Sequence, residues 1–168
     1  MGKLFYIMGK SASGKDTIYQ RLLRNPEFSL ERLVIYTTRP IRDGELDGRE
    51  YHFVTEEDFQ KLKAEGKIIE DRGYETVYGL WRYFTADNMN LEEKSYLGIG
   101  TLESYEKLKA YYGEEKIRPI YIEVEDGERL KRAIAREETQ EAPKYEEMCR
   151  RFLADAQDFS EEKIRQAG

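Results

Sequence analysis

Residues 9 to 15 read Gly9-Lys10-Ser11-Ala12-Ser13-Gly14-Lys15, and this run is the part of the sequence most informative about the fold. It matches the pattern G-x-x-x-x-G-K, whose glycines let successive backbone N–H groups point at phosphate oxygens. The mostly apolar run 3–8 comes before it and predicts a buried strand. Apolar residues at helical spacing, Ile18, Leu22 and Leu23, come after it, and a helix N-terminus there adds a positive dipole end. The sequence therefore predicts a phosphate-binding loop between a strand and a helix.

The end of this motif departs from its usual form. Asp16 stands where a Ser or Thr hydroxyl normally joins the ligands of Mg²⁺, and Thr17 follows it. Two interpretations stay open: Asp16 holds the metal directly or through water, or it caps the helix and favours its dipole. We expect Gly9 to Thr17 to bind ATP with Mg²⁺, Lys15 to reach the β and γ phosphates, and Asp16 and Thr17 to be the metal candidates.

Composition limits the class of protein. The 168 residues fit one domain, 1–168, and 37% charged residues with a mean hydropathy of -0.81 are typical of a globular chain with an ionised surface. The net charge of -6 argues against a general nucleic-acid binder, which needs a basic surface. No apolar run is long enough for a membrane span or signal peptide, and the single Cys149 forms no internal disulfide. We therefore expect a cytoplasmic protein without membrane contact, and nothing here identifies a protein partner.

Hydrophobic periodicity predicts the architecture. Four strand-to-helix units indicate an α/β fold with a parallel sheet flanked by helices, whose core is 1–35 and 85–168. A strand-rich stretch at about 36–84 predicts an insertion with its own small mixed sheet, and the polar segment at about 137–145 predicts a short lid. Other expected features are a strand at Leu33–Tyr36, helix starts at Thr55 and Thr101, and helix stops at Gly66 and Gly113.

A second, longer motif lies in the insertion. Residues 37–54 read Thr-Thr-Arg-Pro-Ile-Arg-Asp-Gly-Glu-Leu-Asp-Gly-Arg-Glu-Tyr-His-Phe-Val. This string resembles the acceptor segment of guanylate kinases, T-T-R-x-x-R-x-G-E-x-x-G-x-D/E-Y-x-F-V, and the resemblance extends over nearly the whole chain. It implies a P-loop NTPase-type fold and the transfer of a phosphoryl group from ATP to GMP.

The resemblance also assigns roles to residues outside the phosphate loop. It implies that two arginines and two tyrosines hold the phosphate of GMP, namely Arg39, Arg42, Tyr51 and Tyr78, the last followed by Gly79. Guanidinium groups and phenol hydroxyls suit a phosphate chemically, because both donate hydrogen bonds to its oxygens. Glu70 matches the glutamate that accepts hydrogen bonds from guanine N1–H and the exocyclic amine. Adenine offers no such pair of donors.

Three departures from the family pattern surround the acceptor. Ile35 stands where a serine often lies, and Leu80 stands where Ser or Thr is usual. The Asp-x-Asp motif after the next strand is replaced by Gly98-Ile99-Gly100. Glu103 or Asp16 are the two candidates to replace these carboxylates, and the sequence does not choose between them.

Arginines near the predicted lid complete the predicted catalytic set. Arg132, Arg136 and Arg151 match the arginines that guanylate kinases bring over the transferring phosphate, with Arg150 as a competing neighbour of Arg151. Arg132 and Arg136 are spaced i, i+4, so they share one helix face. The alternative is a solvated basic face balanced by nearby glutamates. With Lys15 and Arg39, these three arginines are the predicted catalytic residues.

Three functions follow as hypotheses. The first is an ATP:GMP phosphotransferase. The second is a kinase for another phosphorylated acceptor such as a sugar phosphate, which the substitutions at Ile35 and Leu80 would suit. The third is a non-catalytic guanylate kinase-like binding module, against which the intact glycines and Lys15 argue. Typical guanylate kinases carry a further strand and helix near the adenine, so this sequence is expected to be a shortened version or a fragment.

Overall fold

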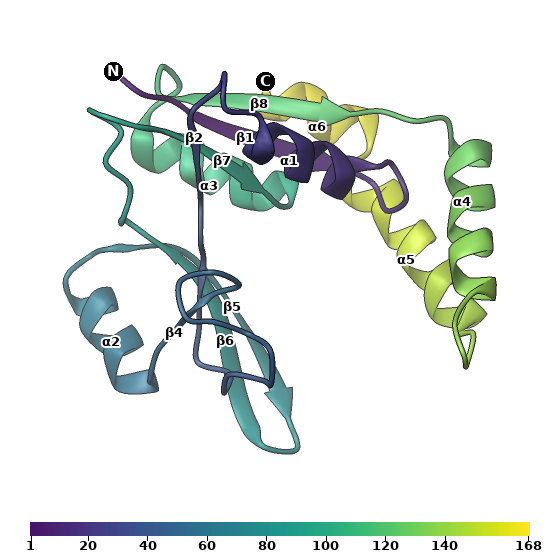
Figure 1. Cartoon of the computed structure of the whole chain (residues 1–168), viewed down its shortest axis with the longest axis horizontal. Helices are drawn as coiled ribbons and strands as arrows, with labels where there is room; N and C mark the ends of the chain where they lie inside the picture. Colours follow the sequence, from purple (N-terminus) through teal and green to yellow (C-terminus); the bar gives the residue numbers. More distant parts are fainter.

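The computed structural model describes residues 1–168 and is built around a parallel sheet. Its strands are β1 (Leu4–Gly9), β2 (Leu30–Arg32), β7 (Ser95–Ile99) and β8 (Ile117–Ile122), in the order β2-β7-β1-β8. Helices α1 (Lys15–Arg24) and α3 (Leu102–Tyr112) cover its two faces (Figure 1). This arrangement confirms the predicted class, a parallel α/β sheet flanked by helices.

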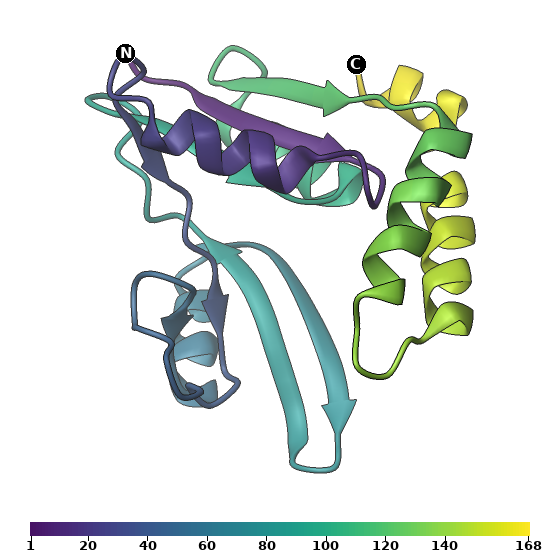
Figure 2. The ribbon, with the colours of Figure 1, turned by 45° about the vertical axis from the view of Figure 1, so that its right-hand side comes forward.

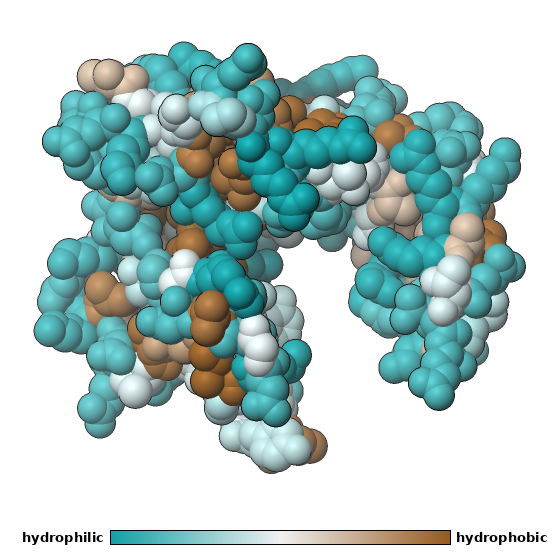
Figure 3. Space-filling model, in the orientation of Figure 1, coloured by the Kyte–Doolittle hydropathy of each residue, from teal (hydrophilic) through white to brown (hydrophobic).

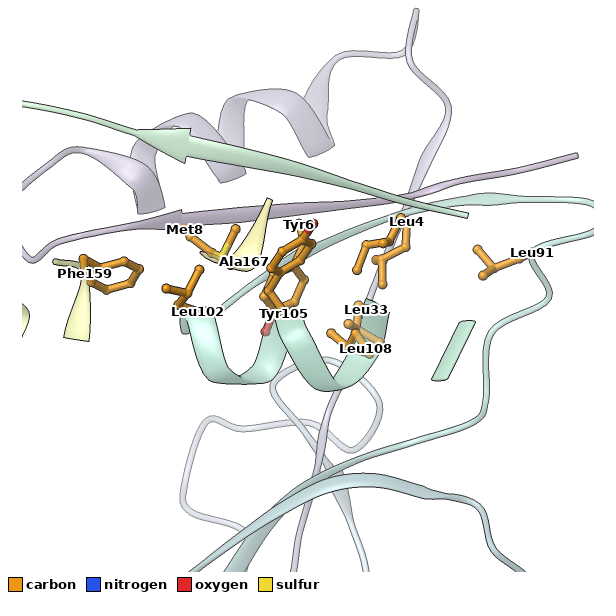
Figure 4. Close-up of a cluster of buried hydrophobic side chains, with 11 residues drawn as sticks. Leu4, Tyr6, Met8, Leu33, Leu91, Leu102, Tyr105, Leu108, Phe159 and Ala167 are labelled. Carbon is orange, nitrogen blue, oxygen red and sulfur yellow. The ribbon is translucent and has the colours of Figure 1, made fainter. Parts of the chain in front are cut away.

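Alternation along β1 explains why both faces of the sheet are covered. Leu4, Tyr6 and Met8 point to the side of α3, where they join Tyr105 and Leu108 in the largest core cluster (Figure 4). On the opposite face, Ile7 and Leu97 pack with Tyr19 of α1. Because strand side chains alternate between faces, a continuous apolar run places hydrophobic groups on both sides at once. β1 is therefore a central strand, and the loop that follows it lies at the carboxyl edge of the sheet.

A second, mixed sheet follows from residue 36. It contains β3 (Tyr36–Thr37), β4 (His52–Phe53), β5 (Ile68–Thr76) and β6 (Gly79–Ala86) in the order β4-β3-β6-β5. Helix α2 (Glu56–Ala64) packs its buried Phe59 against Phe84 of this sheet. As predicted, Thr55 caps α2, here in a reciprocal capping box with Asp58, and Gly66 follows the helix with φ 69°. β5 and β6 form the long hairpin of Figure 2.

The other end of the molecule is helical. α4 (Asp126–Glu138) and α5 (Tyr145–Asp158) lie side by side, joined by residues 139–144, and α6 (Glu161–Ala167) ends the chain (Figure 1). The buried Glu137 accepts a 2.8 Å hydrogen bond from the Lys144 backbone N–H and so closes the connecting loop. The space-filling view shows a broad hollow between this helical pair and the hairpin side (Figure 3). No helix has both the length and the apolar character to cross a bilayer.

Several local expectations were misplaced. The strand expected at Leu33–Tyr36 is wrong, because residues 33–35 link the two sheets between β2 and β3. Leu33 is buried and its N–H bonds to Leu97 O at 3.0 Å, so its apolar character reflects burial beside the sheet. Helix α4 begins three residues before the expected Arg129, because the Glu125 side chain caps it. Helix α6 was not predicted.

Candidate active site

The phosphate loop has the backbone conformation that its sequence predicts. Ala12 and Gly14 have positive φ angles of 60° and 85°, which turn the chain sharply between β1 and α1. The Ser13 N–H bonds to Lys10 O at 3.2 Å, and the Ser13 hydroxyl is buried without a partner. Lys15 is the first residue of α1. The loop thus combines a sharp backbone turn with a helix N-terminus, the combination that phosphate-binding loops use.

A buried arginine joins this loop to the helical pair α4 and α5. The Ser11 N–H donates to Asp155 Oδ2 of α5 at 2.8 Å, and Arg129 Nη1 of α4 donates to Ser11 O at 3.1 Å. Arg129 is 1% exposed, bonds Asp126 at 2.7 Å and lies 3.8 Å from Asp155. Lys10 Nζ is 3.7 Å from the same Asp126 carboxylate. Two carboxylates thus compensate the buried charge, and the network fixes the loop against both helices.

Sequence reasoning missed this network. Arg129 and Asp155 are 26 positions apart on different helices, and nothing in the local pattern marks Arg129 as buried. Arg129 also stacks on the Phe152 ring at 4.7 Å. The one local signal was the i, i+3 spacing of Asp126 and Arg129 on α4, which predicts the ion pair between these two residues.

The two metal candidates lie at the start of α1. Asp16 and Thr17 are both exposed, and Asp16 Oδ2 is 3.8 Å from Lys15 Nζ. No group of three or more His, Cys, Asp or Glu side chains is close enough together to enclose an ion. Mg²⁺ commonly keeps several waters and takes substrate phosphates with only one or two protein ligands. The donor set present, one carboxylate and one hydroxyl beside a phosphate loop, fits that kind of site.

Arg39 is held rigidly in the acceptor segment. It is 4% exposed, and its guanidinium makes a bidentate pair with Glu45 at 2.8 and 3.1 Å. The hydrogen bond with Glu45 raises the pKa of Arg39. That bond lowers the pKa of Glu45, and a second hydrogen bond, from the Arg42 backbone N–H, lowers it further. The Arg39 guanidinium also lies 5.5 Å from the centre of the Tyr51 ring. One carboxylate therefore orients Arg39 and the backbone of Arg42 together.

The two predicted phosphate-binding tyrosines differ in surroundings. Tyr51 is half-buried and packs edge-on against Tyr83, 5.6 Å between ring centres. Tyr78 lies at the tip of the β5–β6 hairpin, 81% exposed, and stacks on Trp81 at 6.0 Å. Gly79 has a positive φ of 104°, which glycine adopts easily because it has no Cβ, and this lets the hairpin turn there.

Glu70 is buried, as a base-reading carboxylate would be. It is 6% exposed on β5, and Oε1 accepts a 3.1 Å hydrogen bond from the Thr85 hydroxyl. Arg72 Nε lies 3.8 Å from the other carboxylate oxygen. Next to this pair is a cavity of about 560 Å³ whose lining includes Arg72, Thr101 and Glu103. Sequence reasoning did not identify Arg72, although its spacing of two from Glu70 on a strand was a signal that both share a face.

Tyr6 lies against Gly98 and Gly100, the two positions where the Asp-x-Asp carboxylates are missing. A Cβ on Gly100 would lie 2.1 Å from the Tyr6 hydroxyl oxygen, and a Cβ on Gly98 would lie 2.6 Å from Tyr6 Cδ2. Figure 4 shows the Tyr6 ring in the core beside Tyr105. Burial raises the pKa of the Tyr6 phenol, and the charge of Glu70 raises it further, so the group is neutral at physiological pH. A neutral phenol thus occupies the space into which side chains at both positions would extend.

Glu103, one of the two candidates to replace those carboxylates, already forms an ion pair with a lysine. Its Oε1 accepts a 2.9 Å hydrogen bond from Lys107 one turn later, which lowers the pKa of Glu103. It lines the same cavity as Arg72, whereas Asp16, the other candidate, lies in the first turn of α1. Of the two candidates, Glu103 is the one that lines this cavity.

The predicted lid arginines lie on α4 and α5. Arg132, Arg136 and Arg151 are all exposed. Arg132 pairs with Glu128 at 3.1 Å and Arg151 with Glu147 at 3.8 Å, whereas the Arg136 guanidinium is in no ion pair. Exposed pairs of this kind contribute little to stability, so these arginines can exchange partners readily. In Figure 2 their helices stand across the open space from the β5–β6 hairpin.

Comparisons with known proteins show which family the chain resembles. A family model described as Guanylate kinase matches residues 1–162. A guanylate kinase of Wolbachia pipientis wMel is 31% identical over 157 residues, 93% of this chain and 75% of that protein. One of Schizosaccharomyces pombe is 40% identical over 101 residues, 60% of this chain and 44% of that protein. The match to a guanylate kinase of Vibrio parahaemolyticus covers 45% of that protein. This chain thus spans about half the length of several curated relatives that it matches.

A solved structure supports the fold. The crystal structure of guanylate kinase from Anaplasma phagocytophilum superposes with a TM-score of 0.57, covering 97% of this chain and 73% of that one, at 24% sequence identity. At this identity the likeness concerns the fold.

Proposed function

Because the chain belongs to the guanylate kinase family, we propose that it transfers the γ-phosphoryl group of ATP to the phosphate of GMP, giving ADP and GDP. One observation carries the proposal: the phosphate loop occurs together with a second site that offers an oriented arginine, Arg39, and a buried carboxylate, Glu70. A phosphate-binding arginine and a base-reading carboxylate are what a nucleoside monophosphate needs. The intact loop and Lys15 favour an enzyme over a binding module.

The reaction needs positioning and charge compensation more than a general base. A phosphate oxygen of GMP attacks the γ-phosphorus of ATP, and the bond from that phosphorus to the β–γ bridging oxygen breaks, so ADP leaves with that electron pair. We assign Lys15 to the β and γ phosphates. Arg39, Arg42, Tyr51 and Tyr78 would bind the acceptor phosphate, and their donors would hold its oxygen in line.

The lid arginines would act on the transferring group. Arg132 and Arg136 are one turn apart on α4, and Arg151 lies on the adjacent α5. We propose that they approach the phosphoryl group when the hollow of Figure 3 closes. Closure would exclude water, which competes as an acceptor and weakens the arginine charges.

Mg²⁺ is the metal that this scheme includes. Asp16 and Thr17 would contribute a carboxylate and a hydroxyl, directly or through water, with ATP phosphates and waters supplying the other ligands. When bound, the ion offsets negative charge on the phosphates. The proposal also includes a cytoplasmic location, where ATP is available and the single, exposed Cys149 stays reduced.

A coupled assay of ADP formation tests the proposal. The acceptors are GMP, AMP, CMP, UMP and a sugar phosphate, each with Mg²⁺ and ATP. The expected result is rapid ADP formation with GMP and little with the others. If the sugar phosphate is used in preference to GMP, the acceptor is a sugar phosphate and the GMP assignment is wrong. If no acceptor supports ADP formation, the proposal that the chain is a kinase is wrong.

A further inference from the structure

We infer that Arg72 is a specificity-determining residue of the acceptor site, where it donates hydrogen bonds to O6 and N7 of guanine beside Glu70. This inference rests on the proposed function, because it names how that site would recognise the base of GMP.

The placement of Arg72 is the first argument. Glu70 and Arg72 are two positions apart on β5, so their side chains leave the strand on one face. Arg72 Nε lies 3.8 Å from Glu70 Oε2, and this Nε is buried without a hydrogen-bond partner. The intervening Asp71 points the other way, toward Arg82 at 3.7 Å. A carboxylate and a guanidinium therefore stand side by side on the face that carries the acceptor residues.

Two cavities meet at this side chain. Arg72 lines the 560 Å³ cavity next to Thr101 and Glu103. It also lines a second cavity of about 370 Å³ formed with Ile35 and Tyr51. Tyr51 and Ile35 both belong to the acceptor region, so Arg72 connects the base-reading carboxylate with the rest of that site.

The chemistry of guanine supplies the second argument. Its edge carries two donor groups, the exocyclic amine and N1–H, followed by two acceptors, O6 and N7. Glu70 can satisfy only the donors. The acceptors need a donor next to the carboxylate, and an arginine bonded to O6 and N7 is the commonest specific contact with guanine in protein–DNA complexes.

The residues at the two substituted base-contact positions and the nearest threonine hydroxyls do not offer that donor. Ile35 and Leu80 carry no polar hydrogen, and the Thr85 hydroxyl already donates to Glu70. The Thr101 hydroxyl is engaged at the start of α3, where it accepts from the Ser104 N–H at 3.2 Å and donates to Ser104 Oγ at 3.1 Å. Arg72 thus replaces the missing hydroxyl donors.

Arg72 would also reject adenine. Adenine has an amine where guanine has O6, so the guanidinium would face a donor, and Glu70 would lose the N1–H. Both members of the pair would be left with unmatched polar groups in a partly buried site.

Steady-state kinetics with base analogues test the inference. The proteins are wild type, Arg72→Met, Arg72→Lys and a control, Arg165→Met, whose side chain lies on the exposed face of α6. The acceptors are GMP and 7-deaza-GMP, which lacks the N7 acceptor. A bidentate contact with guanine predicts that kcat/KM for GMP falls about 5- to 150-fold in Arg72→Met. Arg72→Lys should be intermediate, the control should match wild type, and KM for ATP should not change.

The analogue separates a contact from a structural role. Wild type should prefer GMP over 7-deaza-GMP, and Arg72→Met should use the two equally. If wild type uses GMP but treats both acceptors alike, the inference is wrong while the proposed function stands. This comparison needs no variant, so it decides the point even if Arg72→Met does not fold. If wild type does not use GMP, both the proposed function and the inference fall.

Discussion

Asp155→Ala is the change that tests how the phosphate loop is held. Asp155 accepts the Ser11 N–H at 2.8 Å and lies 3.8 Å from Arg129 Nη1, and its side chain is 16% exposed. The substitution leaves the Ser11 N–H without its partner, and a hydrogen bond to a charged group contributes about 1.5–3 kcal/mol. Arg129 loses one of two carboxylates but keeps Asp126 at 2.7 Å.

The remaining Asp126 limits the electrostatic part of the loss. Breaking a buried ion pair completely costs about 3–5 kcal/mol of stability. Because Arg129 keeps Asp126, the electrostatic part of the lost stability should be far smaller than that. We therefore expect Asp155→Ala to lower the free energy of unfolding by about 2–4 kcal/mol. Asp155→Asn should cost less, because its amide oxygen still accepts from Ser11. KM for ATP should rise more than KM for GMP, since the loop is the proposed ATP site.

Urea unfolding measures the stability, and a double-mutant cycle with Arg129→Leu measures the coupling. Asp158→Ala is the matched control, because Asp158 is three positions later on the same helix and exposed. The double variant should lose less than the sum of the two single variants. A loss below about 0.5 kcal/mol in Asp155→Ala, the size of an ordinary surface change, would show that Asp155 does not hold the phosphate loop.

Three further predictions follow from the site. Lys15→Ala should lower kcat by orders of magnitude and leave the unfolding transition unchanged, because Lys15 would compensate phosphate charge and belongs to no hydrophobic core cluster; near-normal kcat would contradict the kinase assignment. Glu70→Gln should lower kcat/KM for GMP about 5- to 100-fold with KM for ATP unchanged, since one amide N–H would face a donor of guanine; equal use of GMP would show that Glu70 does not read the base. The pKa of Glu45 is lowered in the folded state by Arg39, so its stabilising effect is present above its ordinary pKa and is lost as pH falls through the lowered value. From pH 7 down to about 3, the melting temperature of wild type should therefore fall more than that of Glu45→Gln, and parallel curves would contradict this.

Local features of the fold could be predicted from the sequence. The phosphate loop needs only a short motif with a strand before it and a helix after it. Helix α2 begins at a capping Thr55 and ends near Gly66 because both signals act over a few residues. The strand expected at Leu33–Tyr36 was wrong because burial of Leu33 in a linker gives the same apolar pattern as a strand.

Features that depend on long-range contacts could not be predicted. The missing carboxylates at Gly98 and Gly100 were visible in the sequence, but that Tyr6 fills their space depends on how β1 and β7 pair. The contact of Arg129 with Asp155 depends on the packing of α4 on α5. In each case the residues are unremarkable in their own segments and acquire a role only through a distant partner.

Under the proposed function, the γ-phosphoryl group of ATP moves to GMP. The most direct measurement of this transfer is a single turnover of ATP labelled with ³²P at the γ position, with enzyme in excess over ATP, Mg²⁺ and saturating GMP, and separation of the products. We predict that the label appears in GDP in proportion to the ADP formed, and that Lys15→Ala abolishes this transfer. Label recovered only in inorganic phosphate, or ATP left intact in the presence of GMP, would contradict the claim.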